Sequence, residues 1–396
     1  MIRTILLKMV MIILIIYPWN GFQFIFTLGG LSIIRIMSFV IIILGLCFGY
    51  FAYGFKQYKK TFFLFLFFFF SLLGSLTYDR PNFPEYFKIL GFAIFMIVLV
   101  GLKPQVKELR KWIIFSSYSF GLMLLVSLTD FLGFISVTNF NESLSSVGRG
   151  DIRIFDLVGP FPTRSYLGGV ISFYFPIPLL LIVNKTKYRL IHILILILIF
   201  PVILFAHSRG LVLSLGITFL LLSILYRRTF AIYVLLFIIL IFISFNYISP
   251  LFDDLNFIRL FSLNRGSANI QDRIRLYAFI ETIKEILVNP FGCGFSTVYI
   301  PKAYDYYSPH NNITYILRSG GFFGFLMFLI FVFKILKREL KIFLKTKIIT
   351  EKTFFLFIIL SSSFYGLTHL TINFLPFWIS IGVMILAFRN KINIII

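Results

Sequence analysis

Three short polar stretches of the chain place a cation or an imidazole at the edge of a long apolar run. The first, His207-Ser208-Arg209-Gly210, connects two apolar runs by a tight turn. An arginine in so short a turn reaches little water, so its guanidinium needs an anionic partner. That partner is an aspartate of the chain or a phosphate group of a ligand. The alternative is an arginine whose side chain only extends to the membrane surface.

The second stretch is Pro309-His310-Asn311-Asn312, directly before another apolar run. Asn311 or Asn312 is a good N-cap, so the imidazole of His310 would lie at a helix N-terminus. The helix dipole disfavours a cation there and helps to keep the ring neutral. A neutral imidazole accepts a proton from a hydroxyl, which is the task of a general base in glycosyl transfer. Helix capping without chemistry is the alternative.

The third stretch, Asp272-Arg273-Ile274-Arg275, holds two arginines two positions apart. On a helix these side chains diverge by about 200°, so one would face a pocket while the other faces water. The stretch opens an amphipathic segment over 271–289 that ends at Asn289-Pro290. Such a helix would lie on the outer membrane surface or cap the other helices. Its predicted apolar face consists of Leu276, Phe279, Ile280, Ile283 and Leu287.

The elements that position these stretches belong to a membrane protein. Of the 396 residues, 59% are hydrophobic and 13% are charged, whereas a soluble domain has about 45–50% apolar and about 25% charged residues. Long uncharged runs exclude a nucleic-acid-binding protein despite the formal net charge of +22. The two cysteines exclude a disulfide framework and a cysteine-based metal site.

Apolar runs predict an all-α integral membrane protein with about twelve transmembrane helices in a single polytopic domain over 1–396. Pro176 and Pro178 should kink the sixth span. Two outer loops are long, at about 135–164 and 248–311, and the second contains the amphipathic segment. The predicted spans are roughly 5–28, 32–54, 61–77, 86–102, 112–134, 165–183, 190–206, 210–226, 229–247, 312–333, 353–368 and 371–388.

Charge distribution predicts the orientation of these spans. If both termini are cytoplasmic, the inner segments hold most of the 37 basic residues but only three acidic ones, Glu108, Glu339 and Glu351. This is the positive-inside pattern. The remaining outer basic residues are mostly arginine, whose planar, forked guanidinium suits bidentate recognition of phosphate or carboxylate.

The three stretches in this order resemble the superfamily of O-antigen ligases and O-antigen polymerases, which are bacterial envelope glycosyltransferases. The resemblance covers about 156–336. Tyr277 stands where the family often has tryptophan, and Cys293 separates the paired glycines. The matching residues are Ser208-Arg209-Gly210, Arg273-Ile274-Arg275-Leu276-Tyr277, Asn289-Pro290-Phe291-Gly292-Cys293-Gly294, His310-Asn311 and Gly320-Gly321-Phe322-Phe323-Gly324.

This resemblance implies a GT-C-like glycosyltransferase in the bacterial inner membrane, which takes a glycan from undecaprenyl pyrophosphate for lipopolysaccharide or surface polysaccharide synthesis. Arg209 and Arg273 would bind the pyrophosphate, with Arg275 as a further, more tolerant candidate. His310 would activate the acceptor, which is a lipid or a glycan. Ser208, Gly210 and Asn311 would support these groups. The pyrophosphate is itself the leaving group, so no metal, nucleotide or other cofactor is expected.

Two alternatives differ in class from this enzyme. A flippase for lipid-linked oligosaccharides should line a cavity through its spans with cations, but the mid-span positions are almost free of charge. A structural membrane subunit would explain none of the motifs. Within the enzyme class, a ligase delivers a finished chain to a lipid core and a polymerase extends the chain on its carrier, and both need the same donor site.

Overall fold

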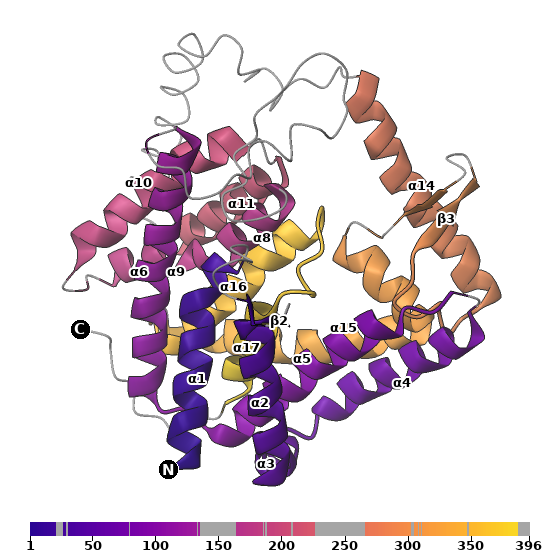
Figure 1. Cartoon of the computed structure of the whole chain (residues 1–396), viewed down its shortest axis with the longest axis horizontal. Coiled ribbons are helices and arrows are strands. Elements are labelled where there is room, and N and C mark those ends of the chain that lie inside the picture. The colour runs from indigo at the N-terminus through magenta and orange to yellow at the C-terminus, as the bar shows by residue number, and fades with distance from the viewer. Residues whose placement is uncertain are drawn as a thin grey trace.

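The computed structural model shows a chain made mostly of helices (Figure 1). It describes residues 1–20, 27–28, 31–78, 80–132, 134, 164–184, 186, 188–206, 209–225, 266–301, 305–307, 309, 311–346 and 348–386. At residues 27, 28, 31, 164, 204–206, 209, 223–225, 266–273 and 305 it describes the backbone alone.

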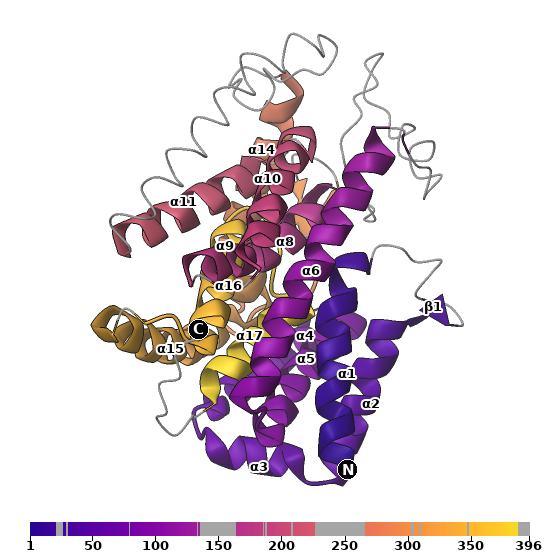
Figure 2. The same ribbon diagram turned by 90° about the vertical axis from the view of Figure 1, so that its left-hand side faces the viewer.

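The N-terminal elements form one side of the molecule, where α1, α2 and α6 run side by side (Figure 2). The first helix ends in a 3-10 turn that contains Pro18, which cannot continue an α-helix. A small antiparallel ribbon follows it. These elements are α1 (Ile2–Ile16), η1 (Tyr17–Trp19), β1 (Thr27–Leu28), β2 (Leu31–Ser32), α2 (Ile33–Cys47), α3 (Tyr50–Gln57), α4 (Thr61–Thr77), α5 (Phe83–Leu102) and α6 (Val106–Phe131).

The later elements pack against this group and include a second antiparallel ribbon. The predicted kink at Pro176 is confirmed, because α8 ends at Tyr174 and α9 begins at Pro176. These elements are α8 (Arg164–Tyr174), α9 (Pro176–Val183), α10 (Arg189–Ala206), α11 (Arg209–Leu225), α14 (Gly266–Val288), β3 (Val298–Ile300), β4 (Asp305–Tyr307), α15 (Asn312–Thr346), α16 (Glu351–Gly366) and α17 (Leu375–Ile385).

Each predicted span except the ninth overlaps at least one described helix, although the first, 5–28, is helical only to Trp19 and includes β1; the ninth, 229–247, lies outside the described residues. By length and composition, five described helices are able to cross a membrane, or six if the bent pair α2–α3 is one span. The described apolar helices at 61–77, 189–203, 210–222 and 375–385 are shorter. The described part of the chain is thus mostly helical, as expected for an all-α membrane protein, and the number of twelve spans stays a prediction.

Two predicted spans have different shapes from those expected. The prediction of one continuous helix over 32–54 is wrong, because α2 and α3 meet at an 82° bend. Gly49 has a φ of 71°, a left-handed conformation that ends the first helix. The last predicted span begins later than expected, at Leu375, because residues 367–374 form a loop between α16 and α17.

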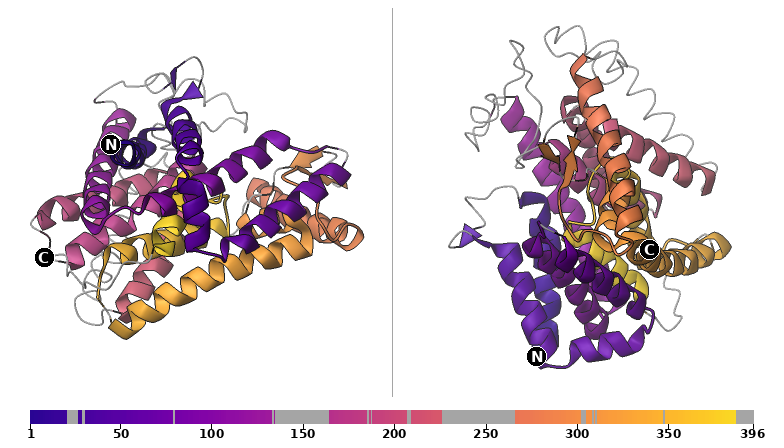
Figure 3. Two further views of the ribbon diagram at one scale, coloured as in Figure 1. Left: turned by 90° about the horizontal axis from the view of Figure 1, so that it is seen from below. Right: turned by 90° about the vertical axis from the view of Figure 1, so that its right-hand side faces the viewer.

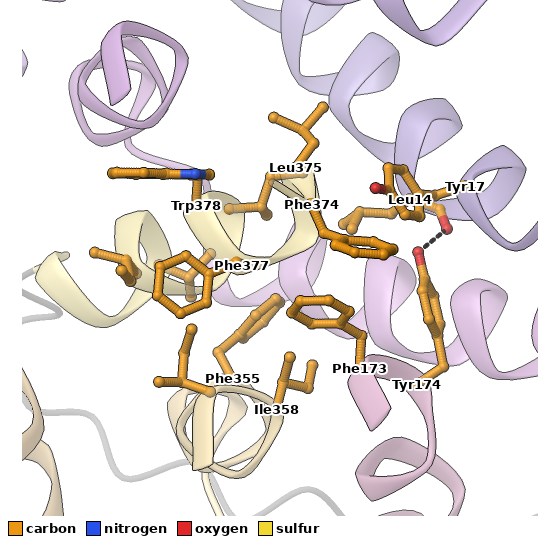
Figure 4. Packing of buried hydrophobic residues seen from close by; sticks show 14 of the residues in the cluster. Leu14, Tyr17, Phe173, Tyr174, Phe355, Ile358, Phe374, Leu375, Phe377 and Trp378 are labelled. Carbon is orange, nitrogen blue, oxygen red and sulfur yellow. Dashed lines mark hydrogen bonds between the residues drawn. The ribbon is translucent and has the colours of Figure 1, made fainter. Parts of the chain in front are cut away.

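The core lies where α1, α8, α16 and α17 converge, and it consists largely of aromatic rings (Figure 4). Tyr174 is almost fully buried, and its hydroxyl donates a hydrogen bond of 2.8 Å to the carbonyl of Leu14. Phe173 and Phe374 pack with ring centroids 5.5 Å apart. This packing fixes α17, and with it the loop 367–374, against the N-terminal helices.

Helix α15 lies along α4 (Figure 3). The phenylalanine-rich sequence of α4 supplies the contact: Phe67 packs on Phe328 at 5.2 Å between centroids, and Phe70 lies 5.9 Å from Phe323. Phe70 also stacks on Phe291, with centroids 5.8 Å apart. The long α15 is thereby held beside the segment that follows α14.

That segment and α15 meet in what we call the glycine joint, formed by residues 289–294 and 318–322. The amide of Cys293 donates to the carbonyl of Arg318 at 2.8 Å, and the amide of Phe322 donates to the carbonyl of Pro290 at 3.1 Å. Gly321 has a φ of 63°, and a Cβ there would collide with the carbonyl oxygen of Pro290. Only glycine permits this backbone contact.

The predicted amphipathic helix is confirmed as α14, which begins earlier than expected, at Gly266, and ends before Asn289-Pro290. Its predicted apolar face is exposed, with Leu287 80% accessible. The opposite side is buried: Ala278 packs with Val298 and Ile300 of the β3–β4 ribbon. Helix α14 therefore buries Ala278 and Ile286 and turns the predicted apolar face outward.

Candidate active site at the α16–α17 loop

The first turn of α15 is tied to the α16–α17 loop, residues 367–374. Asn311 caps the helix, because its side-chain oxygen accepts a hydrogen bond of 2.8 Å from the amide of Thr314. The side chain of Asn312 donates to the hydroxyl of Thr371 at 2.6 Å and accepts from the amides of Thr371 and Ile372 at 2.8 and 3.2 Å. His310 itself lies outside the described residues. Asn312, two residues further along the chain, is nevertheless fixed to this loop.

The first turn of α11 lies against the same loop. A Cβ on Gly210 would collide with the hydroxyl of Thr368 and would approach the Nδ1 atom of His369 to 3.1 Å. Glycine thus lets the loop approach the helix closely. His207 and Ser208 lie outside the described residues, and Arg209 is described by its backbone alone. Two of the three predicted stretches therefore meet at one loop.

His369 also lies in this loop. Its ring stacks on Tyr365, with centroids 4.5 Å apart and planes 4° apart, and its Nδ1 atom lies 2.9 Å from the hydroxyl of Thr368. The hydroxyl of Tyr365 donates to the carbonyl of Ser165 at 2.8 Å. By contrast, His192 is buried beside Ser117 and Tyr118, away from this loop.

The third predicted stretch lies on α14, which the structure attaches to α15 by the glycine joint and by an ion pair. Arg318 pairs with Glu285 of α14. Arg275 is half-buried, whereas Arg273 is described by its backbone alone. Pyrophosphate binding by Arg209, Arg273 and Arg275 stays a prediction.

Sequence reasoning missed Arg318, which lies inside the predicted span 312–333 and is only 1% exposed. Its guanidinium donates to the carbonyls of Ser296 and Thr297 at 3.2 and 2.7 Å and to the hydroxyl of Tyr78 at 3.0 Å. A charge inside an apolar run is rare and needs such partners. The signal available in the sequence was the position of this arginine inside an apolar run.

A second missed residue is Glu85, in the first turn of α5. Its Oε1 atom accepts hydrogen bonds from the hydroxyl of Tyr315 at 3.0 Å and from the side-chain amide of Asn373 at 2.7 Å. Lys88 lies 3.2 Å from the same atom. Helices α5 and α15 and the α16–α17 loop thus meet at one carboxylate. In the described part of the chain, no three His, Cys, Asp or Glu side chains form a group that could hold a metal ion.

The structure contains apolar helices long enough to cross a membrane. Polar and charged side chains gather where α5, α11, α15 and the α16–α17 loop meet. These features define a helical integral membrane protein with a polar site at one end. Residues 192–329 match the family model described as O-antigen ligase. This match supports the resemblance of the chain to the superfamily of O-antigen ligases and polymerases.

The matched region runs from α10 into α15 and contains all the motif residues from Ser208 to Gly324. It supports a function of the O-antigen ligase or polymerase type, with lipid-linked glycans as substrates and a place in the bacterial inner membrane. Glu85, His369 and Asn373 lie outside it. No curated protein and no solved structure matches the chain significantly.

Proposed function

We propose that this protein is a GT-C-like glycosyltransferase that takes a glycan from undecaprenyl pyrophosphate at the outer face of the inner membrane. It attaches that glycan to a lipid or glycan acceptor in lipopolysaccharide or surface polysaccharide synthesis. The observation that carries the proposal is the meeting of two motifs at the α16–α17 loop, where Gly210 contacts Thr368 and Asn312 is hydrogen-bonded to Thr371.

The reaction breaks one bond to the anomeric carbon and forms another. The acceptor hydroxyl oxygen bonds to that carbon of the donor sugar, and the bond from the carbon to the carrier phosphate oxygen breaks. His310 takes the hydroxyl proton; it directly precedes Asn311, the cap of α15, and a helix N-terminus favours a neutral imidazole. Undecaprenyl pyrophosphate leaves with the electron pair.

The arginines stabilise that leaving group. Arg209, the first residue of α11, and Arg273 of α14 would bind the pyrophosphate, because a guanidinium donates two parallel hydrogen bonds to phosphate oxygens. Ser208, Gly210 and Asn311 support these groups by shaping the turns that hold them. Arg275 serves as the more tolerant arginine of its pair.

A transfer assay with lipid-linked glycan in membranes tests the proposal through His310 and Arg209. His310→Ala should slow transfer by roughly 10²–10⁴-fold without loss of carrier binding, and His310→Gln should be about as inactive because an amide does not accept the proton. Arg209→Lys should fail nearly as badly as Arg209→Ala, because lysine lacks the fork. Normal transfer by His310→Gln would contradict the base. Translocation of the lipid-linked glycan without a new glycosidic bond would identify a flippase.

The orientation of the spans is part of the proposal, and the ion pairs support it. Arg3 donates to the carbonyls of Leu102 and Lys103, and Lys352 lies 3.3 Å from Glu339. Arg3, Lys103, Glu339 and Lys352 belong to segments predicted inside, and Leu102 is the last residue of the predicted span 86–102. A cysteine at position 145 should react with an impermeant thiol reagent from outside and one at position 345 should not. Labelling of both from one side would overturn this orientation.

The phenotype of a deletion strain separates the two activities of the superfamily. If the protein is a ligase, its loss leaves carrier-linked polymer and a bare lipid core. If it is a polymerase, its loss leaves a core with at most one repeat.

A further inference from the structure

Three side chains donate hydrogen bonds to one carboxylate oxygen of Glu85. Its Oε1 atom accepts from Tyr315, Asn373 and Lys88, at 3.0, 2.7 and 3.2 Å. Tyr315 is 4% exposed, and these donors come from three parts of the chain. A carboxylate fixed by several donors cannot turn away, so its direction is set before any ligand arrives.

Part of this carboxylate remains open. The Oε2 atom has one protein donor in the described residues, Lys88 at 3.3 Å, and the side chain is 22% exposed. A carboxylate accepts about four hydrogen bonds, so Oε2 has room for hydroxyl donors. The Lys88 side chain is 36% exposed and has a third N–H beyond the two directed at Glu85. An open acceptor and an open donor therefore lie side by side.

Helix α14 provides a contrast within the same molecule. Glu281 pairs with Lys284 at the same spacing, i to i+3, and its side chain is 21% exposed. Exposure and ion pairing are thus the same as for Glu85. Within the part of the chain that the structure describes, Glu281 has no counterpart of the Tyr315 and Asn373 hydrogen bonds. The extra donors of Glu85 are therefore specific to the place where α5 meets α15.

That place adjoins the proposed site of transfer. Tyr315 lies in the first turn of α15, five residues after His310 in the sequence. Asn373 lies in the loop that holds Asn312 through Thr371. Helix α17, which follows this loop, packs against α5 and contacts α15 (Figure 1).

We propose that Glu85 and Lys88 form a glycan-binding subsite, which recognises hydroxyl groups of a sugar near the transferred bond. Glu85 accepts hydrogen bonds from sugar hydroxyls and Lys88 donates one. Tyr315 and Asn373 are positioning residues that hold the carboxylate. The subsite rests on the proposed function, because it takes the same glycan, and it lies outside the O-antigen ligase match at 192–329. It would thus set which glycan is used rather than how the bond is broken.

Glu85→Gln and Lys88→Met test the subsite in the full-length protein. KM is measured for the lipid-linked glycan and, in a separate series, for the acceptor. The probe of the subsite is free oligosaccharide released from the carrier, used as an inhibitor. Loss of a charged hydrogen bond should raise KM for the glycan-bearing substrate by about 10–100-fold, with a much smaller change in kcat. Inhibition by free oligosaccharide should weaken by a similar factor, because that probe lacks the pyrophosphate. Inhibition by undecaprenyl pyrophosphate should stay unchanged.

The control is Glu281→Gln, which removes the matched glutamate and should leave KM for both substrates unchanged. If Glu85→Gln does not accumulate, Lys88→Met still tests the subsite, because Lys88 makes no hydrogen bond to Tyr315 or Asn373 in the described structure. If free oligosaccharide inhibits the accumulating variants as strongly as the wild type, the subsite is overturned. Transfer by the wild-type protein would in that case still uphold the proposed function. Absence of transfer by the wild-type protein would overturn the proposed function and the subsite together.

Discussion

Helix α15 is held from two sides, at the glycine joint and at the α16–α17 loop, and the two contacts use different parts of the chain. In the joint the backbones themselves touch: the amide of Phe322 donates to the carbonyl of Pro290, and Gly292 and Gly321 both have positive φ. At the loop the contact is made by a side chain, because the side chain of Asn312 makes three hydrogen bonds to Thr371 and Ile372.

The difference separates two kinds of motif residue. A backbone contact excludes every residue except glycine, so the glycines of the joint are explained by structure alone. When a side chain that makes a contact is removed, its partners lose that contact, but the backbone keeps its position. Substitutions in the joint should therefore change how much folded protein exists. Substitutions at the loop should change what the folded protein does.

Gly321→Ala breaks the joint most severely. The new Cβ would collide with the carbonyl oxygen of Pro290, and alanine is strained at a φ of 63°. We expect folded protein to fall below detection in membranes, as measured by immunoblot and by size-exclusion chromatography in detergent.

Gly216→Ala is the matched control, because nothing lies within 4 Å of a Cβ built at that position of α11. Alanine favours a helix over glycine by roughly 0.5–1 kcal/mol, so this variant should accumulate normally or slightly better. Normal accumulation of Gly321→Ala would show that the joint yields to a side chain.

Arg318→Gln breaks the side-chain support of the joint. Arg318 is 1% exposed and pairs with Glu285, so its removal leaves Glu285 without its cation and two carbonyls without their donor. Breaking a buried pair in this way costs about 3–5 kcal/mol. The thermal unfolding temperature should drop strongly, and the folded fraction should retain transfer. An unchanged melting temperature would mean that the glycines hold the joint alone.

Asn312→Ala acts at the loop and should have the opposite signature. Three hydrogen bonds to Thr371 and Ile372 are lost, but the helix backbone is unaffected and Asn311 still caps it. We expect a modest loss of stability and a fall in transfer of about 10–100-fold, because misplacement of a reacting group by about 1 Å is enough for such an effect.

Asn289→Ala is the control for that variant, because Asn289 lies in the joint and donates a single exposed hydrogen bond of 3.0 Å to Thr77. Transfer per folded molecule should be unchanged. If Asn289→Ala and Asn312→Ala lowered transfer equally, the division between the joint and the loop would be wrong.

Local sequence patterns predicted the elements of both regions but few of the contacts between them. Apolar runs located the helices, and a cap of α15 at Asn311 or Asn312 followed from the preference of asparagine for the N-cap. The 82° bend after α2 was missed, because a glycine in an apolar run fits a straight membrane helix equally well.

The contacts of the candidate site depend on residues far apart in the sequence. Glu85 and Tyr315 are 230 positions apart, and Glu85 and Asn373 are 288 apart. No periodicity or spacing connects such residues, so the carboxylate was invisible until the helices were packed. The same holds for Arg318 and Glu285, whose pairing depends on the turn that the glycine joint imposes.

Reactivity of Cys293 gives the smallest effect and reports on the joint directly. Burial raises the pKa of its thiol to about 11, and its sulfur lies 3.8 Å from Glu285. Only the thiolate reacts, so at pH 8 roughly one molecule in a thousand is reactive, and alkylation should quicken about tenfold per pH unit up to the pKa. The measurement is made in a Cys47→Ala background by mass spectrometry after iodoacetamide treatment.

Arg318→Gln loosens the joint, so it should raise the rate at pH 8 toward that of a free thiol, whereas Asn312→Ala should leave it unchanged. Equal acceleration by both variants would show that the joint and the loop open together, and the contrast between them would then be one of chemistry only.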